Sequence, residues 1–372
     1  MAKTKAKGRS ARPAKAAGPY LGEVIVSHRF CAARFPKPPK LRDVGDGNRA
    51  RLIRETAFKW MNGKTIKYWF YDKPARWTAD ESQENVVRKA FDMWKALGIG
   101  LDFAEVPSRQ DADVRIAFDL ADGSWSYVGT DLLDQPKDEQ TMNFGWSLTA
   151  DPQEGLDTAL HEIGHTLGFP HEHQNPFAGI VWDEEAVYRS LAAPPNRWSR
   201  STTFHNIIEK IVPDTVQGSS WDPNSVMHYP FEAGLILKPP KYRRGLSPKG
   251  GLSARDRSWV RKFYPPIKPG AARALGRFQS TPLRIAAGGQ ADFDFTADQT
   301  REYSFATFGV ADTQLAVSGT VGGKTAVLAE DDDSGADRNA MLRIKLRKGE
   351  QVRVQVRMRY IGQPGEAALM VW

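Results

Sequence analysis

Two parts of the chain carry regular patterns of hydrophobic residues, and their periods differ. Residues 65–71 alternate, with Ile66, Tyr68 and Phe70 on one face, which is typical of a β-strand. The next pattern has helical spacing and ends at Gly98. Its apolar members are Val87, Ala90, Phe91, Trp94 and Leu97.

Capping residues and short apolar runs place the neighbouring elements. Thr78 followed by Glu81 predicts a capping box at the start of the first helix. Short strands are expected near residues 101 and 112, and a second helix over about residues 156–168. This order predicts an α+β domain in which a mixed sheet carries two long helices.

Beyond Pro265 the helical period disappears. The segment LRIKLRKGEQVRVQVRM alternates strictly, with apolar residues at 342, 344, 346, 352, 354 and 356 and with Lys348 and Gly349 between the two runs. We interpret it as one β-hairpin with a face toward water. Similar runs around turns such as Gly322 and Gly323 predict a small all-β sandwich.

The change of pattern marks a domain boundary, because 372 residues are too many for one ordinary domain. We expect a tail over 1–53 that is a candidate propeptide, an α+β domain over 54–266, a linker over 267–276 and a β-sandwich over 277–372. No apolar run reaches the 18 residues of a membrane span, so no transmembrane segment is predicted. Cys31 is the single cysteine, which excludes an intramolecular disulfide.

The net charge of +8 is concentrated at one end of the chain. Residues 1–20 contain six Lys and Arg side chains and no acid, so the folded parts are nearly neutral and no specific nucleic-acid partner is expected. A solvated disordered arm is the simplest interpretation, and attraction to a polyanion or a membrane surface is the alternative. The arm lacks the apolar core of a signal peptide.

The segment DTALHEIGHTLGFPHEH carries the chemistry. On a helix, His161 and His165 are one turn apart on the same face, which is the separation that two imidazoles need to bind one Zn²⁺. Gly168 can end the helix in the left-handed conformation, so that the chain turns back and offers His171 as a third ligand. Glu162 lies about 100° around the helix, where it can act on a water without binding the metal.

Three imidazoles leave an open position, which is the mark of a catalytic zinc. One catalytic Zn²⁺ is therefore the expected cofactor, and Glu162 is the expected general base for a metal-activated water. The predicted reaction is hydrolysis, and no GxxxxGK[ST] loop suggests nucleotide turnover.

Further motifs carry a resemblance to a known family. HEIGHTLGFPHEH, followed about fifty residues later by SVMHYPF, resembles the metzincin metallopeptidases and, within them, the astacins. FKWMNGKTIKYWF and GLSARDRSWVRKFYP are similar to the segments that open and close the mature astacin domain, so the resemblance covers about residues 54–266. It implies a metzincin-type fold, a Met-turn at Met227, and a role for Tyr229 as a zinc ligand that can swing to stabilise the oxyanion.

The resemblance also implies a function. The chain is expected to be a secreted zinc endopeptidase acting on proteins or peptides, although no signal peptide is present and a cytoplasmic location is the alternative. Its oligomeric state cannot be derived from the sequence. A second function class stays open, namely a catalytically weak zinc-containing protein that adheres to a polymer or polyanion.

Several residues near the motif have other interpretations. The family's usual run after the third histidine is replaced here, and His173 is expected to be a partly exposed loop residue rather than a fourth ligand, as are His28, His205 and His228. Glu172 matches the family glutamate that contacts the mature N-terminus. An arginine, among Arg189, Arg197 and Arg243, could favour an acidic residue after the scissile bond.

The segment before residue 54 is a candidate latency switch. Cys31 offers a thiolate to the open zinc position, in a basic setting expected to lower its pKa. Asp46, with Gly45, matches the last two positions of the FxGD motif of astacin precursors, but Asp43 stands where phenylalanine is expected. An inert leader is the third alternative.

The C-terminal sandwich resembles the bacterial prepeptidase C-terminal domain, especially from FGVADTQLAVSG to QVRVQV. Its acidic cluster of Glu330, Asp331, Asp332 and Asp333 offers the oxygen ligands that Ca²⁺ prefers. A solvated acidic turn is the alternative.

Overall fold

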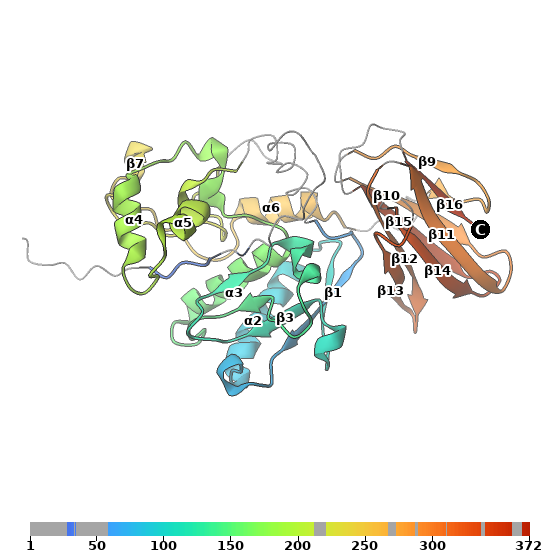
Figure 1. Cartoon of the computed structure of the whole chain (residues 1–372), viewed down its shortest axis with the longest axis horizontal. Coiled ribbons are helices and arrows are strands. Elements are labelled where there is room, and N and C mark those ends of the chain that lie inside the picture. The colour runs from blue at the N-terminus through green and yellow to red at the C-terminus, as the bar shows by residue number, and fades with distance from the viewer. Residues whose placement is uncertain are drawn as a thin grey trace, which may run out of the picture.

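The computed structural model describes residues 28–32, 34, 59–211, 221–266, 273–286, 289–309, 311–335, 339–358 and 367–372. An α+β part and a β-sandwich follow one another along the chain (Figure 1). The predicted fold class is confirmed, since a mixed sheet with two long helices precedes an all-β region.

A five-stranded sheet with the order β2-β1-β3-β5-β4 forms one layer of the first domain. The strands are β1 (Thr65–Phe70), β2 (Asp102–Glu105), β3 (Val114–Ala117), β4 (Trp125–Ser126) and β5 (Met142–Asn143). The pairs β1–β2, β1–β3 and β3–β5 are parallel, whereas β4 joins β5 antiparallel and leaves its other edge unpaired by any strand of this sheet.

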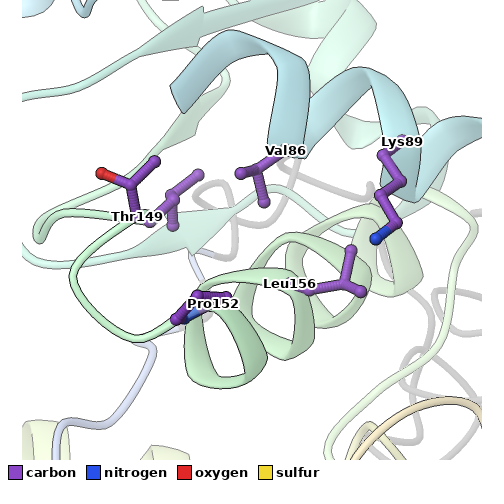
Figure 2. Close-up of a pocket in the computed structure, with 6 residues that line it drawn as sticks. Val86, Lys89, Thr149, Pro152 and Leu156 are labelled. Carbon is purple, nitrogen blue, oxygen red and sulfur yellow. The ribbon is translucent and has the colours of Figure 1, made fainter. Parts of the chain in front are cut away.

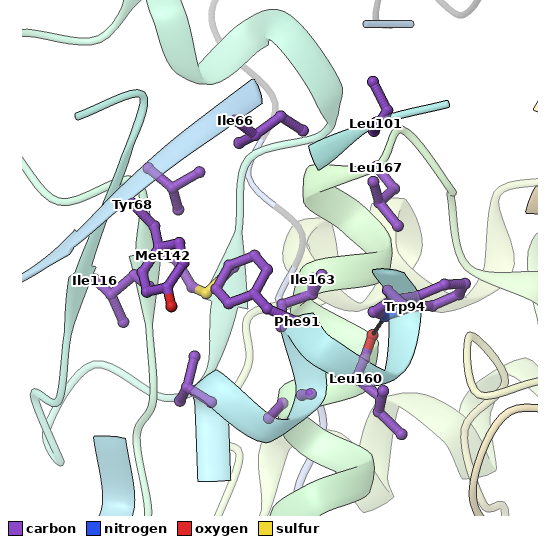
Figure 3. Close-up of a cluster of buried hydrophobic side chains, with 14 of the residues drawn as sticks. Ile66, Tyr68, Phe91, Trp94, Leu101, Ile116, Met142, Leu160, Ile163 and Leu167 are labelled. Atoms are coloured by element: carbon purple, nitrogen blue, oxygen red, sulfur yellow. Dashed lines mark hydrogen bonds between the residues drawn. The ribbon is translucent and has the colours of Figure 1, made fainter. Parts of the chain in front are cut away.

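Helices α2 (Glu81–Lys95) and α3 (Pro152–Thr166) pack against this sheet. Figure 3 shows their shared core, in which Phe91 and Trp94 of α2 lie beside Leu160 and Ile163 of α3. The Trp94 indole N–H donates to the Leu160 carbonyl at 3.1 Å, so the indole is buried without losing its hydrogen bond.

Both helix starts differ from the prediction. Helix α2 is capped by Asp80, whose side chain accepts from the Gln83 N–H, while the Thr78 hydroxyl donates to the Ala75 carbonyl of the preceding turn. Helix α3 begins at Pro152 rather than near residue 156, because Asp151 is its N-cap and proline is favourable at the first helical position. Its first three residues, Pro152, Gln153 and Glu154, are exposed, so this end of the helix has no apolar period.

Beyond α3 the chain forms a smaller lobe with its own hydrophobic cluster. Its elements are β6 (Val181–Trp182), α4 (Glu184–Ala192), α5 (Arg200–Thr203), a π-helical turn (Phe204–Ile208) and β7 (Ile236–Lys238). The last helix of this domain, α6 (Ala254–Phe263), packs through Val260 against the core of α2 and α3. Strands β6 and β7 pair antiparallel.

The C-terminal domain is a sandwich of a five-stranded sheet, β13-β12-β15-β10-β8, and a four-stranded sheet, β14-β11-β16-β9. The strands are β8 (Arg273–Ala274), β9 (Thr281–Leu283), β10 (Gln290–Thr296), β11 (Arg301–Gly309), β12 (Thr313–Val321), β13 (Lys324–Asp331), β14 (Met341–Leu346), β15 (Gln351–Met358) and β16 (Ala367–Val371). The turn at Gly322 and Gly323 joins the hairpin β12–β13, as expected.

The predicted hairpin of residues 342–356 is wrong. Strand β14 pairs with β11 and strand β15 with β10 and β12, so the Lys348–Gly349 turn crosses from one sheet to the other. Both strands turn apolar residues toward the same core. Alternation therefore looks the same in a hairpin and in two facing strands.

The two domains meet through polar contacts. The Asn62 N–H donates to the Gln290 side chain at 2.9 Å, the Gln355 amide donates to the Asn62 carbonyl, and Lys64 pairs with Glu330. Strand β8 lies inside the range 267–276 that was predicted as a linker and belongs to the sandwich. The other domain boundaries stay predictions.

A small groove lies between α2 and α3 (Figure 2). Its lining is mainly apolar and consists of Val86, Lys89, Leu148, Thr149, Pro152 and Leu156. At a rise of about 1.5 Å per residue, Pro152 is about 14 Å along α3 from the first histidine of the motif, so the groove is separate from the candidate metal site. Within the described ranges, no helix has the length and apolar character to cross a membrane.

Candidate metal centre

Helix α3 presents His161 and His165 with their Nε2 atoms free to bind a metal. The Nδ1–H of His161 donates to the Val226 carbonyl at 2.7 Å, and the Nδ1–H of His165 donates to the Phe169 carbonyl at 2.8 Å. Because a carbonyl only accepts, each contact fixes the tautomer that leaves Nε2 with a lone pair.

The chain turns back after α3, as predicted. Gly168 has a φ of 89°, in the left-handed region, and the following residues bring His171 against the helix. The Nε2 atoms of His165 and His171 are 3.1 Å apart.

The donor set fits a metal ion. One ligand atom from each of His161, His165, His171 and Cys31 lies within 4.8 Å of the others, and this is the one such group in the part of the chain that the structure describes. His161 Nε2 is buried without a hydrogen-bond partner. Burial lowers the pKa of all three imidazoles, to about 4 for His161, so they are neutral donors of the kind that zinc binds.

Glu162 lies in the same buried space. Its Oε2 accepts from the Cys31 thiol at 3.4 Å, and its Oε1 is buried without a hydrogen-bond partner. Burial raises the pKa of this carboxyl group to about 8. This buried carboxyl group contacts the cluster of donor atoms through Cys31, and there it has the position required to accept a proton from water.

Tyr229 contacts both the third histidine of the motif, His171, and Cys31 of the N-terminal segment. Its hydroxyl contacts His171 Nε2 and donates to the Cys31 carbonyl at 2.5 Å. The ring is 4% exposed and packs on both His161 and His171. The hydroxyl is therefore held beside the candidate metal ligands and already donates to a peptide carbonyl.

Met227 lies directly beneath the histidines. A Cβ on Gly164, between His161 and His165 on α3, would come within 2.3 Å of the Met227 sulfur. The turn that carries Met227 is braced by Asp256 of α6, whose carboxylate accepts from the Ser225 hydroxyl at 2.6 Å and the Val226 N–H at 2.9 Å. Sequence reasoning missed Asp256, although Ser253 and Asp256 have capping-box spacing and form one here.

Two histidine predictions are wrong. His173 and His228 are 1% and 3% exposed rather than loop residues in contact with solvent. His173 Nε2–H donates to the Asn206 carbonyl at 2.8 Å, and its ring packs 4.7 Å from that of Tyr229. His173 thus belongs to the wall behind Tyr229, whereas His205 is exposed and pairs with Glu209.

The leader segment, of which the structure describes residues 28–32 and 34, contacts both lobes of the first domain (Figure 1). The Ala32 N–H donates to the Ser124 carbonyl at 3.2 Å, and Arg34 forms a parallel bridge with Tyr127 and pairs with Asp122 at 2.7 Å. Asp46, the other candidate latency residue, lies outside the described residues.

The expected low pKa of Cys31 is wrong for this environment. Burial and the nearby Glu162 carboxylate raise the pKa of the thiol well above its ordinary value. The basic residue Arg34 does not act on it, because its guanidinium lies over the Trp125 ring and pairs with Asp122.

The acidic cluster of the sandwich forms part of a turn. Asp331 accepts from the Ser334 hydroxyl at 2.5 Å and from the Met341 N–H at 2.8 Å, with one oxygen each. Glu330 pairs with Lys64 of the first domain. A calcium site formed with Asp332 and Asp333 stays a prediction.

Comparisons with known proteins agree with this centre. Residues 53–235 match the family model described as Astacin, a family of peptidases. Karilysin of Tannerella forsythia is 26% identical over 199 residues, which cover 45% of this chain and 41% of karilysin. Bone morphogenetic protein 1 of Xenopus laevis is 29% identical over 196 residues, which cover 49% of this chain and 24% of that protein.

The solved structure of myroilysin is also similar. It is 31% identical, and the match covers 57% of this chain and 98% of the myroilysin chain with a TM-score of 0.51. The chain therefore belongs to the astacin family of zinc metallopeptidases. It spans less than half the length of the curated relatives named above. The likeness of the sandwich to prepeptidase C-terminal domains stays a prediction.

Proposed function

We propose that the protein is a zinc endopeptidase that hydrolyses peptide bonds in protein or peptide substrates. The observation that carries the proposal is the convergence of three imidazole nitrogens and the Glu162 carboxylate in one buried space. Zinc, when held by His161, His165 and His171, supplies a Lewis acid that activates water and polarises the substrate carbonyl.

Glu162 moves the proton in this proposal. Its carboxylate takes a proton from the attacking water and then delivers it to the leaving amine nitrogen. The environment of Glu162 supports this role. Its Oε1 is buried and has no hydrogen-bond partner in the described part of the chain, so this oxygen can accept a proton from water.

Tyr229 stabilises the charge that develops on the substrate carbonyl oxygen. The support is its hydrogen bond to the Cys31 carbonyl, a peptide carbonyl beside the candidate metal ligands. A substrate carbonyl at the same place would receive the same donor.

Replacing Glu162 tests the proposal. Glu162→Gln removes the proton acceptor and no metal ligand, so peptide cleavage should fall by at least about 10²-fold while zinc content and the thermal unfolding midpoint stay near those of the parent. Glu154→Gln, an exposed glutamate on the same helix, is the matched control and should retain activity. In protein trimmed to remove the leader, activity of Glu162→Gln within tenfold of the parent would contradict the mechanism, and an inactive trimmed parent with stoichiometric zinc would favour the adhesion protein.

We propose further that the leader keeps the enzyme latent through Cys31. The support is the position of the thiol, whose sulfur is 3.4 Å from Glu162 and within 4.8 Å of the histidine donor atoms. A thiolate is a good zinc ligand and would fill the position that water needs.

The latency proposal is tested on untrimmed protein. Cys31→Ala should be active without proteolytic trimming, a mercurial should activate the parent, and Asp46→Ala should stay latent as the parent does. Activation of Asp46→Ala alone would assign the switch to that residue. Equal activity of all untrimmed forms would show that the leader does not gate the site.

The location of the protein is a separate proposal. We expect secretion, by resemblance to the family, and immunoblots of culture medium and cell lysate from the source organism would separate this from a cytoplasmic location.

A further inference from the structure

We infer that the aromatic pocket filled by Phe30 is a substrate subsite, and that it selects an aromatic or large aliphatic residue directly before or directly after the residue whose carbonyl is attacked. The inference rests on the proposed peptidase function. The inference goes beyond that function because it assigns a substrate side-chain preference and names the residues that determine this preference.

Phe30 is seated in a pocket made of aromatic rings. Its ring centroid is 5.0 Å from that of Tyr229, 5.8 Å from that of Phe231 and 6.2 Å from that of Trp198, and the side chain is 7% exposed. The Phe30–Tyr229 contact is edge-to-face, a favourable geometry for two aromatic rings. These three neighbours carry no charge, so the pocket favours an apolar occupant.

The pocket lies one residue from the reacting centre. Phe30 directly precedes Cys31, whose sulfur contacts Glu162 and whose carbonyl accepts from the Tyr229 hydroxyl. A peptide that places a carbonyl beside Tyr229 therefore places a neighbouring side chain at the pocket. This adjacency restricts the preference to the residue directly before the one whose carbonyl is attacked or, for a substrate that runs in the opposite direction, to the residue directly after it.

The backbone of the occupant is held without regard to its sequence. The Asn196 side chain accepts from the Phe30 N–H at 3.0 Å and donates to the His28 carbonyl at 2.9 Å. One amide thus binds the N–H of one residue and the carbonyl of the residue two places before it, and any peptide in the same conformation can offer these two groups. Selectivity must then come from the side-chain pocket.

The three wall residues all have contacts outside the leader. Tyr229 packs on His161 and His171, and the Trp198 N–H donates to the Leu191 carbonyl at 2.8 Å. Phe231 exchanges backbone hydrogen bonds with Leu246, and its ring packs 4.7 Å from that of Trp182 and 5.3 Å from that of His173. Removal of the leader would therefore leave a formed apolar pocket open to a substrate. The same geometry argues against an acidic preference here, because the Phe30 ring meets aromatic rings rather than Arg189, Arg197 or Arg243, which are exposed.

A cleavage-site profile tests the preference. Full-length protein activated by limited proteolysis is given a mixed peptide library, and Phe, Tyr, Leu or Met should be enriched directly before or directly after the residue that supplies the scissile carbonyl. Trp198→Ala should reduce that enrichment by about tenfold or more relative to small residues. Trp259→Ala, on α6 and outside the pocket, is the matched control and should leave the profile unchanged. Cleavage without this enrichment, or with an acidic preference, would overturn the subsite while leaving the peptidase intact.

A binding measurement separates the subsite from catalysis. Trimmed, zinc-loaded Glu162→Ala protein is titrated with a peptide of residues 28–34 that carries Cys31→Ser, and with the same peptide that also carries Phe30→Ala. The second peptide should bind at least about tenfold more weakly. Equal affinities would overturn the inference even if the protein cleaved no peptide at all, and a tenfold difference would support the pocket independently of activity.

Discussion

At the scale of single residues, Tyr229 takes part in both the candidate metal centre and the proposed substrate pocket. Its ring supports His171 and walls the Phe30 pocket, and its hydroxyl donates to a peptide carbonyl. The ring and the hydroxyl can be separated experimentally, because phenylalanine retains the ring.

Tyr229→Phe should therefore reduce turnover more than substrate binding. Loss of one donor to a developing oxyanion costs about 10²–10³ in kcat, and KM should change little because the ring and the pocket wall remain. Steady-state kinetics of trimmed protein would measure this, with Tyr188→Phe, on α4, as the control. An unchanged kcat would remove the Tyr229 hydroxyl from the mechanism.

The sequence predicts one part of the site and not the other. His161, Glu162 and His165 follow from helical spacing, and the turn to His171 follows from one glycine, so all four depend on local geometry. Asn196 and Phe30 meet across 166 residues of chain, and no local period encodes such a contact. The burial of His173 was missed for the same reason, since its partner Asn206 lies in another element.

At the scale of elements, the position of α3 depends on a glycine, Gly155, where the helix approaches a neighbouring loop. A Cβ on Gly155 would lie 1.8 Å from the Leu148 carbonyl oxygen, so only glycine allows this close approach of helix and loop. Trp60 and Tyr264 donate to the carbonyls of Thr166 and Leu167 at the other end. The helix that carries the histidines is thus fixed at both ends.

Gly155→Ala should destabilise the protein although alanine is the better helix former. The helical preference of about 1 kcal/mol is outweighed by a clash with rigid backbone, and overpacking of this kind costs about 1–3 kcal/mol. Calorimetric unfolding would show a lower midpoint, whereas Glu154→Ala in the same exposed turn should shift it little. A higher midpoint for Gly155→Ala would mean that the loop yields freely.

The strands of the sandwich show the limit of pattern reading at this scale. Alternation correctly identifies β14 and β15 as strands that each have one apolar face. In the structure, the apolar faces of the two strands contact the same core. Their assignment to different sheets depends on partners β11 and β12, which are strands elsewhere in the chain. A turn at Gly349 is compatible with either arrangement.

At the scale of the whole molecule, the two domains have separate hydrophobic cores and share a polar contact around Asn62 and Lys64. A chain ending at residue 266 should therefore fold and cleave small peptides, because neither of these cores includes a residue of the other domain. Circular dichroism and peptide assays would check this. Aggregation of the truncated chain would show that the domains depend on one another for folding.

Lys59, near the same contact, is expected to make the stability of the protein depend on pH. Burial and the charge of Arg357 lower its pKa to about 8, against about 10.4 in an unfolded chain. Between these values the unfolded state binds more protons, so this lysine makes stability rise with pH from about 8 to 10.4. Unfolding of Lys59→Met should show a smaller rise than the parent over that window, and identical slopes would contradict the prediction.

The separation of Cys31 from Glu162 by 131 residues has a consequence for how the protein is made. A ribosome completes residues 28–34 well before it reaches the histidines, so no molecule acquires its metal site before the segment that covers it. Each site also has one leader, which is joined to it by the chain. The leader therefore has a high effective concentration at the site without needing a high intrinsic affinity for it. Under the latency proposed above, a single cut after Arg34 would convert the leader into a free peptide that dilution carries away.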